Sequence, residues 1–286
     1  MDNTITKQNK NKYIFAGASL IVIALVVYFL FIFHRGPKDI NPEESTGEVK
    51  TLTDIEVAKR PYVTLTPTTD GAEIIFSIEN MAEFDRVEYE LTYQADIPGS
   101  AGGKIQRGST GSDVNPKDEI YKKSILLGTA SKGVRSPDRG VADGKLTLHL
   151  FKGEDEYVTD APWELIEAEG ATSLKDAAGN FKMEVPSLPK SYWAIVADTV
   201  GLPKNTENID TKKVSLPTYG VFSIAPDFTK SAKLSIKLTD SAQSPKLYTY
   251  NHADSKWQQV ESTYDSAGKT VSATVSNFAT FVVVSQ

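Results

Sequence analysis

Four oxygen-bearing side chains in one polar segment are the first residues of this sequence that suggest a ligand. The segment GSDVNPKDE contains Asp113, Asn115, Asp118 and Glu119. Carboxylate and amide oxygens are the ligands that Ca²⁺ prefers, and extracellular loops of this composition bind it weakly. The spacing differs from that of known Ca²⁺ loops, and a proline and a lysine interrupt it. These residues are therefore calcium candidates, and a plain polar loop is the simpler interpretation.

Aromatic residues offer a second kind of site, a platform on which a sugar ring stacks. Trp257 follows Tyr248 and Tyr250 across a predicted hairpin turn, so the three rings are candidates for sugar stacking. Cross-strand aromatic pairing explains the same pattern without a ligand. Trp163 and Trp193 lie among apolar neighbours, which favours core packing for both.

The residues needed for acid-base, nucleophilic or metal chemistry do not form a recognisable pattern. The chain has three histidines and no cysteine, which excludes thiolate metal sites, a Cys nucleophile and disulfides. His149 lies near Glu154, Asp155 and Glu156, a set that suits a metal ion or simply a solvated strand and an acidic turn. His252 lies in a predicted hairpin turn. We expect no catalytic residue, no cofactor and a non-enzymatic protein.

The elements that carry these residues are predicted to be short antiparallel strands. RVEYELTY (residues 86–93) and KLTLHLFK (145–152) alternate apolar and polar side chains with the period of a strand that is buried on one face. The segment PTTDG between residues 62–66 and 73–79 predicts a hairpin. Turn-rich segments separate about a dozen such strands, which predicts a mainly β fold with two antiparallel β-sandwich-like domains.

A long apolar run precedes these strands and predicts a transmembrane helix. YIFAGASLIVIALVVYFLFIF begins at Tyr13, ends at Phe33 and contains no charged residue. A helix of this length spans roughly 30 Å, the thickness of the hydrocarbon core of a bilayer. The run is too long for a cleavable leader and lacks a small-residue exit, so we expect an uncleaved signal anchor in contact with membrane lipid.

The predicted domain organisation follows from this anchor. We expect a cytoplasmic tail (1–12), the transmembrane helix (13–33), a juxtamembrane linker (34–60), a β-sandwich domain (61–203), a linker (204–216) and a small antiparallel β domain (217–286). Basic residues before the helix favour a cytoplasmic N-terminus and extracytoplasmic domains in the cell membrane. Residues 39–286 carry 26 basic and 36 acidic side chains, a formal charge of −10, which disfavours nucleic-acid binding.

The final domain resembles the C-terminal β-modules of bacterial surface proteins. The resemblance rests on GVFSI (220–224), on LYTY and Trp257 in the central hairpin, and on SNFATF (276–281). The end of the chain is also similar to GAIN-type domains, whose last strands are cleaved after a histidine-containing motif. The corresponding residues here are Ser276, Asn277, Phe278, Ala279 and Thr280, so the resemblance implies no self-cleavage.

Together these features predict a membrane-anchored cell-surface protein whose β domains bind or space an extracellular protein or glycan. Residues 99–119 and 129–144 are the best candidates for binding loops because they are long and rich in glycine. A carbohydrate-binding or carbohydrate-active accessory protein is the alternative. An autoproteolytic or pilus-like assembly component is a third hypothesis.

Overall fold

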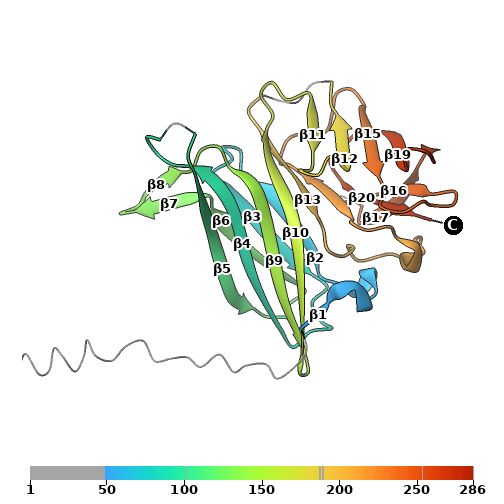
Figure 1. Ribbon diagram of the computed structural model, residues 1–286, viewed down its shortest axis with the longest axis horizontal. Coiled ribbons are helices and arrows are strands. Elements are labelled where there is room, and N and C mark those ends of the chain that lie inside the picture. The colour runs from blue at the N-terminus through green and yellow to red at the C-terminus, as the bar shows by residue number, and fades with distance from the viewer. Residues whose placement is uncertain (1–48, 101, 187, 189, 253, 286) are drawn as a thin grey trace, which may run out of the picture. The chain divides into compact units, whose positions relative to one another are not determined.

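The computed structural model describes residues 49–100, 102–186, 188, 190–252 and 254–285. They belong to one compact unit, Gly47–Gln286, which is mainly β as predicted (Figure 1). Among the described strands, only β1 and β10 run parallel to each other as neighbours; the other pairs are antiparallel. No helix within these residues is long and apolar enough to cross a bilayer, and the predicted span 13–33 lies outside them.

The largest sheet has ten strands and extends through the whole unit (Figure 1). In spatial order it contains β17 (Lys256–Val260), β16 (Lys246–Asn251), β20 (Thr280–Val284), β14 (Tyr219–Phe222), β13 (Trp193–Asp198), β10 (Asp155–Glu167), β9 (Ala142–Lys152), β4 (Arg86–Asp96) and β5 (Lys104–Val114). The tenth strand, β1 (Val49–Thr51), pairs with the end of β10 that β13 leaves free.

Smaller sheets pack against this large one. A three-stranded sheet contains β2 (Tyr62–Pro67), β3 (Glu73–Glu79) and β6 (Ile120–Leu126). A five-stranded sheet contains β11 (Ser173–Lys175), β12 (Phe181–Glu184), β15 (Ala232–Lys237), β19 (Thr270–Val275) and β18 (Ser262–Asp265). A separate hairpin is formed by β7 (Gly128–Ser131) and β8 (Val134–Pro137), and three single-turn helices are η1 (Leu52–Asp54), η2 (Val57–Lys59) and η3 (Thr211–Lys213).

The first hydrophobic core lies between the three-stranded sheet and strands β4, β9 and β10. The predicted alternation is confirmed here, because the apolar positions of both strands are buried: Val87, Tyr89, Leu91 and Tyr93 on β4, and Leu146, Leu148 and Leu150 on β9. Trp163 is also in this core, directly opposite Gly144 on β9. A Cβ atom at Gly144 would lie 2.2 Å from the Trp163 ring, so only glycine fits beneath the indole.

The second core lies between the five-stranded sheet and strands β13, β14, β16 and β20. This arrangement differs from the two separate domains expected at 61–203 and 217–286. Strands β13 and β14, one on each side of the expected linker, pair with each other in the large sheet. Strands β11 and β12, expected in the first domain, are in the sheet of β15. Residues 204–216 also pack against the unit, since Ile209 is buried beside Val284.

The expected juxtamembrane linker also contributes to the folded unit. Part of this segment forms the two single turns η1 and η2. Leu52 and Val57 in these turns are buried, and Lys50 forms an ion pair of 2.7 Å with Asp155. Residues 49–60 are therefore part of the β unit, because their few apolar side chains complete cores formed by distant strands.

Candidate binding site

The two segments predicted as binding loops are largely strands. Residues 99–119 contain β5, and residues 129–144 contain most of the β7–β8 hairpin and the start of β9. Glycine misled the prediction, because Gly111 pairs with Tyr89 in the ladder between β4 and β5. A Cβ atom at Gly111 would lie 2.4 Å from the Tyr89 ring. The glycine is therefore required for packing in a strand and does not indicate a flexible loop.

The structure nevertheless brings these two segments together at one end of the unit. The backbone N–H of Asp96, at the end of β4, donates to the carbonyl of Arg139 at 2.8 Å. Lys104 Nζ, at the start of β5, donates to the carbonyl of Gly140 at 2.7 Å. We call the surface formed by residues 97–100, 102–103 and 128–141 the loop end.

The carboxylate of Asp138 stabilises the loop end through contacts with Tyr93 and Arg107. Asp138 accepts a hydrogen bond from the Tyr93 hydroxyl at 2.9 Å and lies 3.4 Å from Arg107 Nε. Burial, together with the Asp138 carboxylate, raises the pKa of Tyr93, so its hydroxyl stays protonated. Exposed Ile97, on this surface, and Ile105, beside it on β5, add apolar area. The loop end thus combines a fixed polar interior with an accessible apolar rim.

The calcium candidates do not converge on one point. Asp113 accepts hydrogen bonds from the Tyr121 hydroxyl at 3.0 Å and from Lys123 Nζ at 3.2 Å. Asn115 Nδ2 donates to Asp118 Oδ1 at 2.8 Å, while Glu119 makes no such contact within the described chain. Among the described residues no group of three or more His, Cys, Asp or Glu side chains could hold a metal ion. The oxygens of Asp113 and Asp118 are used by neighbouring protein donors.

The predicted aromatic platform is turned inward. Tyr250 and Trp257 pair across β16 and β17 with ring centroids 5.2 Å apart, and both are buried against Val282. Tyr248 is only partly buried, and its hydroxyl lies 3.4 Å from Gln259. Trp163 is a core residue, as expected. Cross-strand packing accounts for the Tyr250–Trp257 pair, and only Tyr248 keeps an accessible ring.

His149 has a local partner. Its Nδ1 lies 2.8 Å from Glu156 Oε1 on the neighbouring strand β10, which makes a cross-strand pair on the exposed face. This contact agrees with the interpretation of His149 as a residue on a solvated strand face.

A hollow beside His252 is lined by hydroxyl, carboxylate, ammonium, imidazole and aromatic side chains. It has a volume of about 360 Å³ and lies between the outer face of the three-stranded sheet and the residues that follow β14. We call it the His252 hollow. Strand register places Thr64, Ser77 and Lys122 side by side across β2, β3 and β6, so that one wall presents two hydroxyls and an ammonium group. The opposite wall contains Ser223 and Asp227.

Several polar groups of this hollow lack a protein partner. Within the described residues, the side chains of Glu79, Lys122 and Asp227 form no hydrogen bond and no ion pair closer than 4 Å. Ser77 is only 4% exposed, and its hydroxyl has no hydrogen-bond partner in the described chain. Burial raises the pKa of Glu79, opposed by the positive charges of Lys204 and Lys122. The side chains of Lys122 and Asp227 are exposed and that of Glu79 is partly buried, so water hydrates these groups and a polar ligand would take its place.

A buried hydroxyl network fixes the rim of the hollow. His252 Nε2 lies 3.4 Å from the Tyr62 hydroxyl, which in turn lies 2.6 Å from Thr280 Oγ1. Tyr250 packs edge-on against the imidazole with ring centroids 5.1 Å apart. Burial on this side lowers the pKa of His252, so the ring is neutral at neutral pH although its outer side faces solvent. Phe278 lines the same hollow and is partly exposed.

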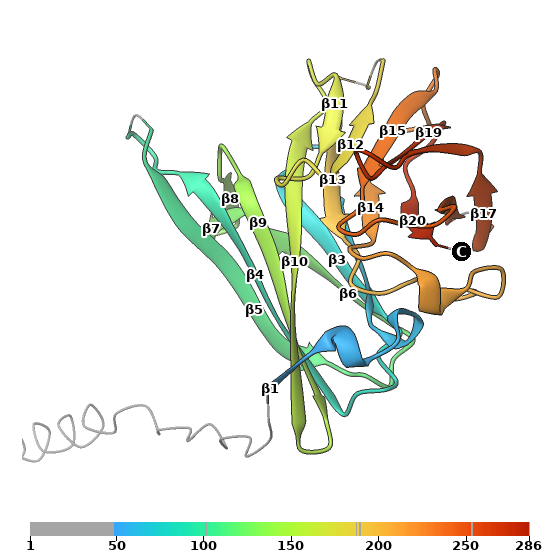
Figure 2. The same ribbon diagram turned by 45° about the vertical axis from the view of Figure 1, so that its right-hand side comes forward.

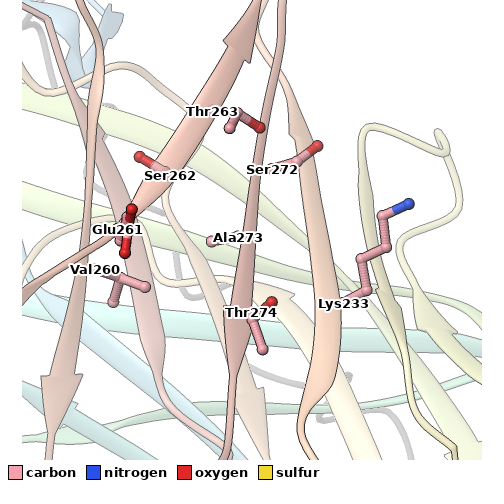
Figure 3. Close-up of a pocket in the computed structure, with 8 residues that line it drawn as sticks. All are labelled: Lys233, Val260, Glu261, Ser262, Thr263, Ser272, Ala273 and Thr274. Carbon is pink, nitrogen blue, oxygen red and sulfur yellow. The ribbon is translucent and has the colours of Figure 1, made fainter.

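A second hollow, of about 570 Å³, lies where the chain passes from β17 to β18 (Figure 3). Its lining is dominated by the hydroxyls of Ser262, Thr263, Ser272 and Thr274, and Figure 3 shows Lys233 on the side away from Glu261. These side chains are exposed or partly exposed, and none of the residues that line it is aromatic. Without an aromatic ring, this hollow offers less varied contacts than the His252 hollow and is the weaker candidate.

No protein-family model matches the chain, and no curated protein matches its sequence. The fold and the site therefore define the protein only as an antiparallel β unit with a loop end and a polar hollow. Sequence reasoning identified His252 as a turn residue but missed the hollow. Its residues come from six separate segments of the chain, and only the packing of the three-stranded sheet against the end of β14 unites them.

Proposed function

We propose that the chain is a non-enzymatic, membrane-anchored cell-surface protein whose β unit binds a partner outside the cell. Residues 13–33 are the proposed anchor, with residues 1–12 in the cytoplasm. The absence of charge in this run supports a bilayer span, and the three lysines that precede it support the orientation.

One observation of the fold carries the binding role. The chain enters the unit at β1, beside the turn between β9 and β10, whereas the loop end lies at the opposite ends of β4, β5 and β9 (Figure 2). A strand of eleven residues such as β9 is roughly 35 Å long. An anchor that joins at the first end leaves the loop end free to meet an extracellular partner.

Membrane fractionation of cells that express the full chain with a C-terminal tag tests the anchor. We expect the tag in the membrane fraction, and we expect protease added to intact cells to remove it. Replacing Ile23 and Leu25 by arginine should release the chain from the membrane, because each charge costs about 3 kcal/mol at a helix centre. Ser19→Ala is the matched control and should stay membrane-bound. A tag that resists protease on intact cells while the chain is membrane-bound would contradict the proposed orientation.

The binding role has a separate test. Full-length chain immobilised through its tag should recover a specific envelope component from detergent extracts. Ile97→Asp together with Ile105→Asp should abolish this recovery, because the two charges replace apolar area at and beside the loop end. Lys237→Ala, on the exposed face of β15, should leave it intact. Equal recovery by all three proteins would remove the loop end from the proposal.

The alternative function, a surface carbohydrate-binding accessory protein, is favoured by a different observation. The His252 hollow combines unpaired hydroxyl and charged groups with a partly exposed aromatic ring. Retention of the full chain on insoluble polysaccharide, compared with a Glu79→Gln variant, tests this alternative. Equal retention of both proteins would contradict a role for the hollow.

A further inference from the structure

We propose that the His252 hollow binds a single uncharged sugar residue of a glycan. The assignment deepens the carbohydrate-binding alternative above and is independent of the membrane anchor. Its volume of about 360 Å³ lies within the range of small-ligand sites.

The polar groups of the hollow match those of a sugar. A sugar hydroxyl both donates and accepts hydrogen bonds, so it needs acceptors and donors at close spacing. Glu79 and Asp227 supply acceptors, and Lys122 supplies donors. The hydroxyls of Thr64 and Ser77 serve in either role and lie on neighbouring strands about 4.8 Å apart. This spacing is suited to adjacent hydroxyls of one ring.

Ser77 presents a hydroxyl to the hollow. The residue is 4% exposed and lines the hollow, and its hydroxyl has no hydrogen-bond partner in the described chain. The hydroxyl oxygen does not belong to the buried unpaired atoms, so it reaches solvent in the hollow and is free to hydrogen-bond to a ligand there. The strand ladder on both sides of Ser77 holds the hydroxyl in place, so little ordering is needed on binding.

The charges around the hollow disfavour three other classes of ligand. Glu79 and Asp227 are opposed by Lys122 in the lining and by Lys204 near Glu79, and His252 is neutral, so the hollow has no excess positive charge that would bind a phosphate or carboxylate group. An entirely apolar ligand would leave Glu79 and Lys122 buried without partners. A cationic ligand would be repelled by the ammonium group of Lys122.

The apolar lining supplies the remaining contact. Phe278 and Ile120 line the hollow with accessible surface, and the Phe278 ring packs edge-on against Phe228 with centroids 4.6 Å apart. The C–H face of a sugar ring is apolar and packs on an aromatic face, where burial of apolar area is favourable. The hollow therefore offers one apolar wall and two polar walls, as an amphipathic ring requires.

Ligand-detected NMR with the full chain tests this assignment, in a detergent without a sugar headgroup. The probes are the methyl glycosides of glucose, galactose and N-acetylglucosamine, with choline and inorganic phosphate as comparators. We expect saturable binding of at least one glycoside and none of phosphate. Glu79→Gln and Ser77→Ala should each weaken it about tenfold, the effect of one lost hydrogen bond to a charged or buried group. Ser272→Ala, in the second hollow, is the matched control and should bind normally.

Three outcomes would overturn the assignment. Saturable binding of choline without any glycoside would identify a cation site, and a loss of glycoside binding in Ser272→Ala but not in Glu79→Gln would place the sugar in the second hollow. Thermal unfolding of each variant reports whether it is folded, and Thr64→Val provides a second variant on the same wall. Failure of glycoside binding with normal membrane fractionation would refute the sugar site and leave the anchored function standing.

Discussion

Asp198, the last residue of β13, is a carboxyl group in an unfavourable environment. Burial raises its pKa from 3.8 to about 6, although the backbone N–H of Val200 donates to it at 2.8 Å and the positive charge of Arg60 opposes the shift. The folded state therefore holds a proton between these two pH values that the unfolded state has lost. Because the folded state binds more protons in this window, the free energy of unfolding falls as the pH rises through it.

Replacing this carboxyl tests the sign of the effect. Relative to Asp198→Asn, the wild-type chain should lose roughly 1–3 kcal/mol of stability between about pH 4 and pH 7, since one pKa unit corresponds to ~1.4 kcal/mol. Denaturant unfolding at several pH values measures this difference. Glu73→Gln is the control of opposite sign, because hydrogen bonds from Ser124 and Arg135 lower the pKa of Glu73. Parallel pH profiles for wild type and Asp198→Asn would contradict the assignment.

Among the candidate ligand residues, the sequence identified side-chain types correctly but not their neighbours. Trp257 and Tyr250 do pair, as the hairpin pattern predicted, but their rings face a core formed with residues from β20 and the segment before β14. Ser77 and Asp227 were not predicted as ligand residues, because a single serine in a strand and a single aspartate in a turn form no recognisable motif. Their importance arises from their positions on opposite walls of one hollow, which only packing defines.

At the scale of elements, β13 connects the two main cores. Ile195 and Ala197 on one face belong to the first core, and Ala194 and Val196 on the other face belong to the second. This explains why its sequence, WAIVAD, shows no alternation: a strand buried on both faces is apolar throughout. The same reasoning applies to β20, where Phe281 and Val283 face the second core and Val282 and Val284 face a smaller apolar cluster that also contains Ile209 and Trp257.

Truncation of β13 should therefore damage both cores. Ile195→Ala is expected to lower the free energy of unfolding by about 2–5 kcal/mol. Val196→Ala should lower it by about 2 kcal/mol through loss of two buried carbon atoms and the cavity left behind. Lys237→Ala, on the exposed face of β15, should change it by less than about 0.5 kcal/mol. Chemical denaturation measures all three, and an unchanged midpoint for either β13 variant would show that the strand is not buried on both faces.

Prediction of strands succeeded where at least one face is buried and failed where neither face is buried or where the element is very short. β4, β9 and β19 were identified from their alternation. β5 was interpreted as a loop because most of its side chains are exposed, small or polar, and its order comes from the ladder with β4. β1, η1 and η2 were assigned to a linker, because elements of three residues are too short to show a recognisable hydrophobic periodicity.

For the whole molecule, the continuous ten-stranded sheet predicts that the unit folds cooperatively. Residues 217–286 retain β14 to β20 but lose β11, β12 and β13, which supply Phe181, Met183 and Val196 to the second core. We expect this fragment alone to give the poorly dispersed amide spectrum of an unfolded chain. Residues 173–286, which restore those three strands, should give better dispersion. A native-like spectrum from 217–286 would show that the C-terminal part is an independent domain.

The sequence by itself determined the mainly β class, the antiparallel pairing and the buried faces of the alternating strands. These features depend on local periodicity, because a strand with one solvent-exposed face must alternate apolar and polar side chains. The absence of cysteine and the uncharged run at residues 13–33 are likewise properties of the sequence alone.

Only the tertiary structure decided how the strands are shared between sheets, and with that the boundaries of the unit and the position of the hollow. Pairing of β13 with β14 and of β12 with β15 joins segments that the sequence separates with a polar, proline-bounded stretch. The free energy that selects such long-range pairs comes from burying both faces of one sheet, and no local window of sequence contains both partners.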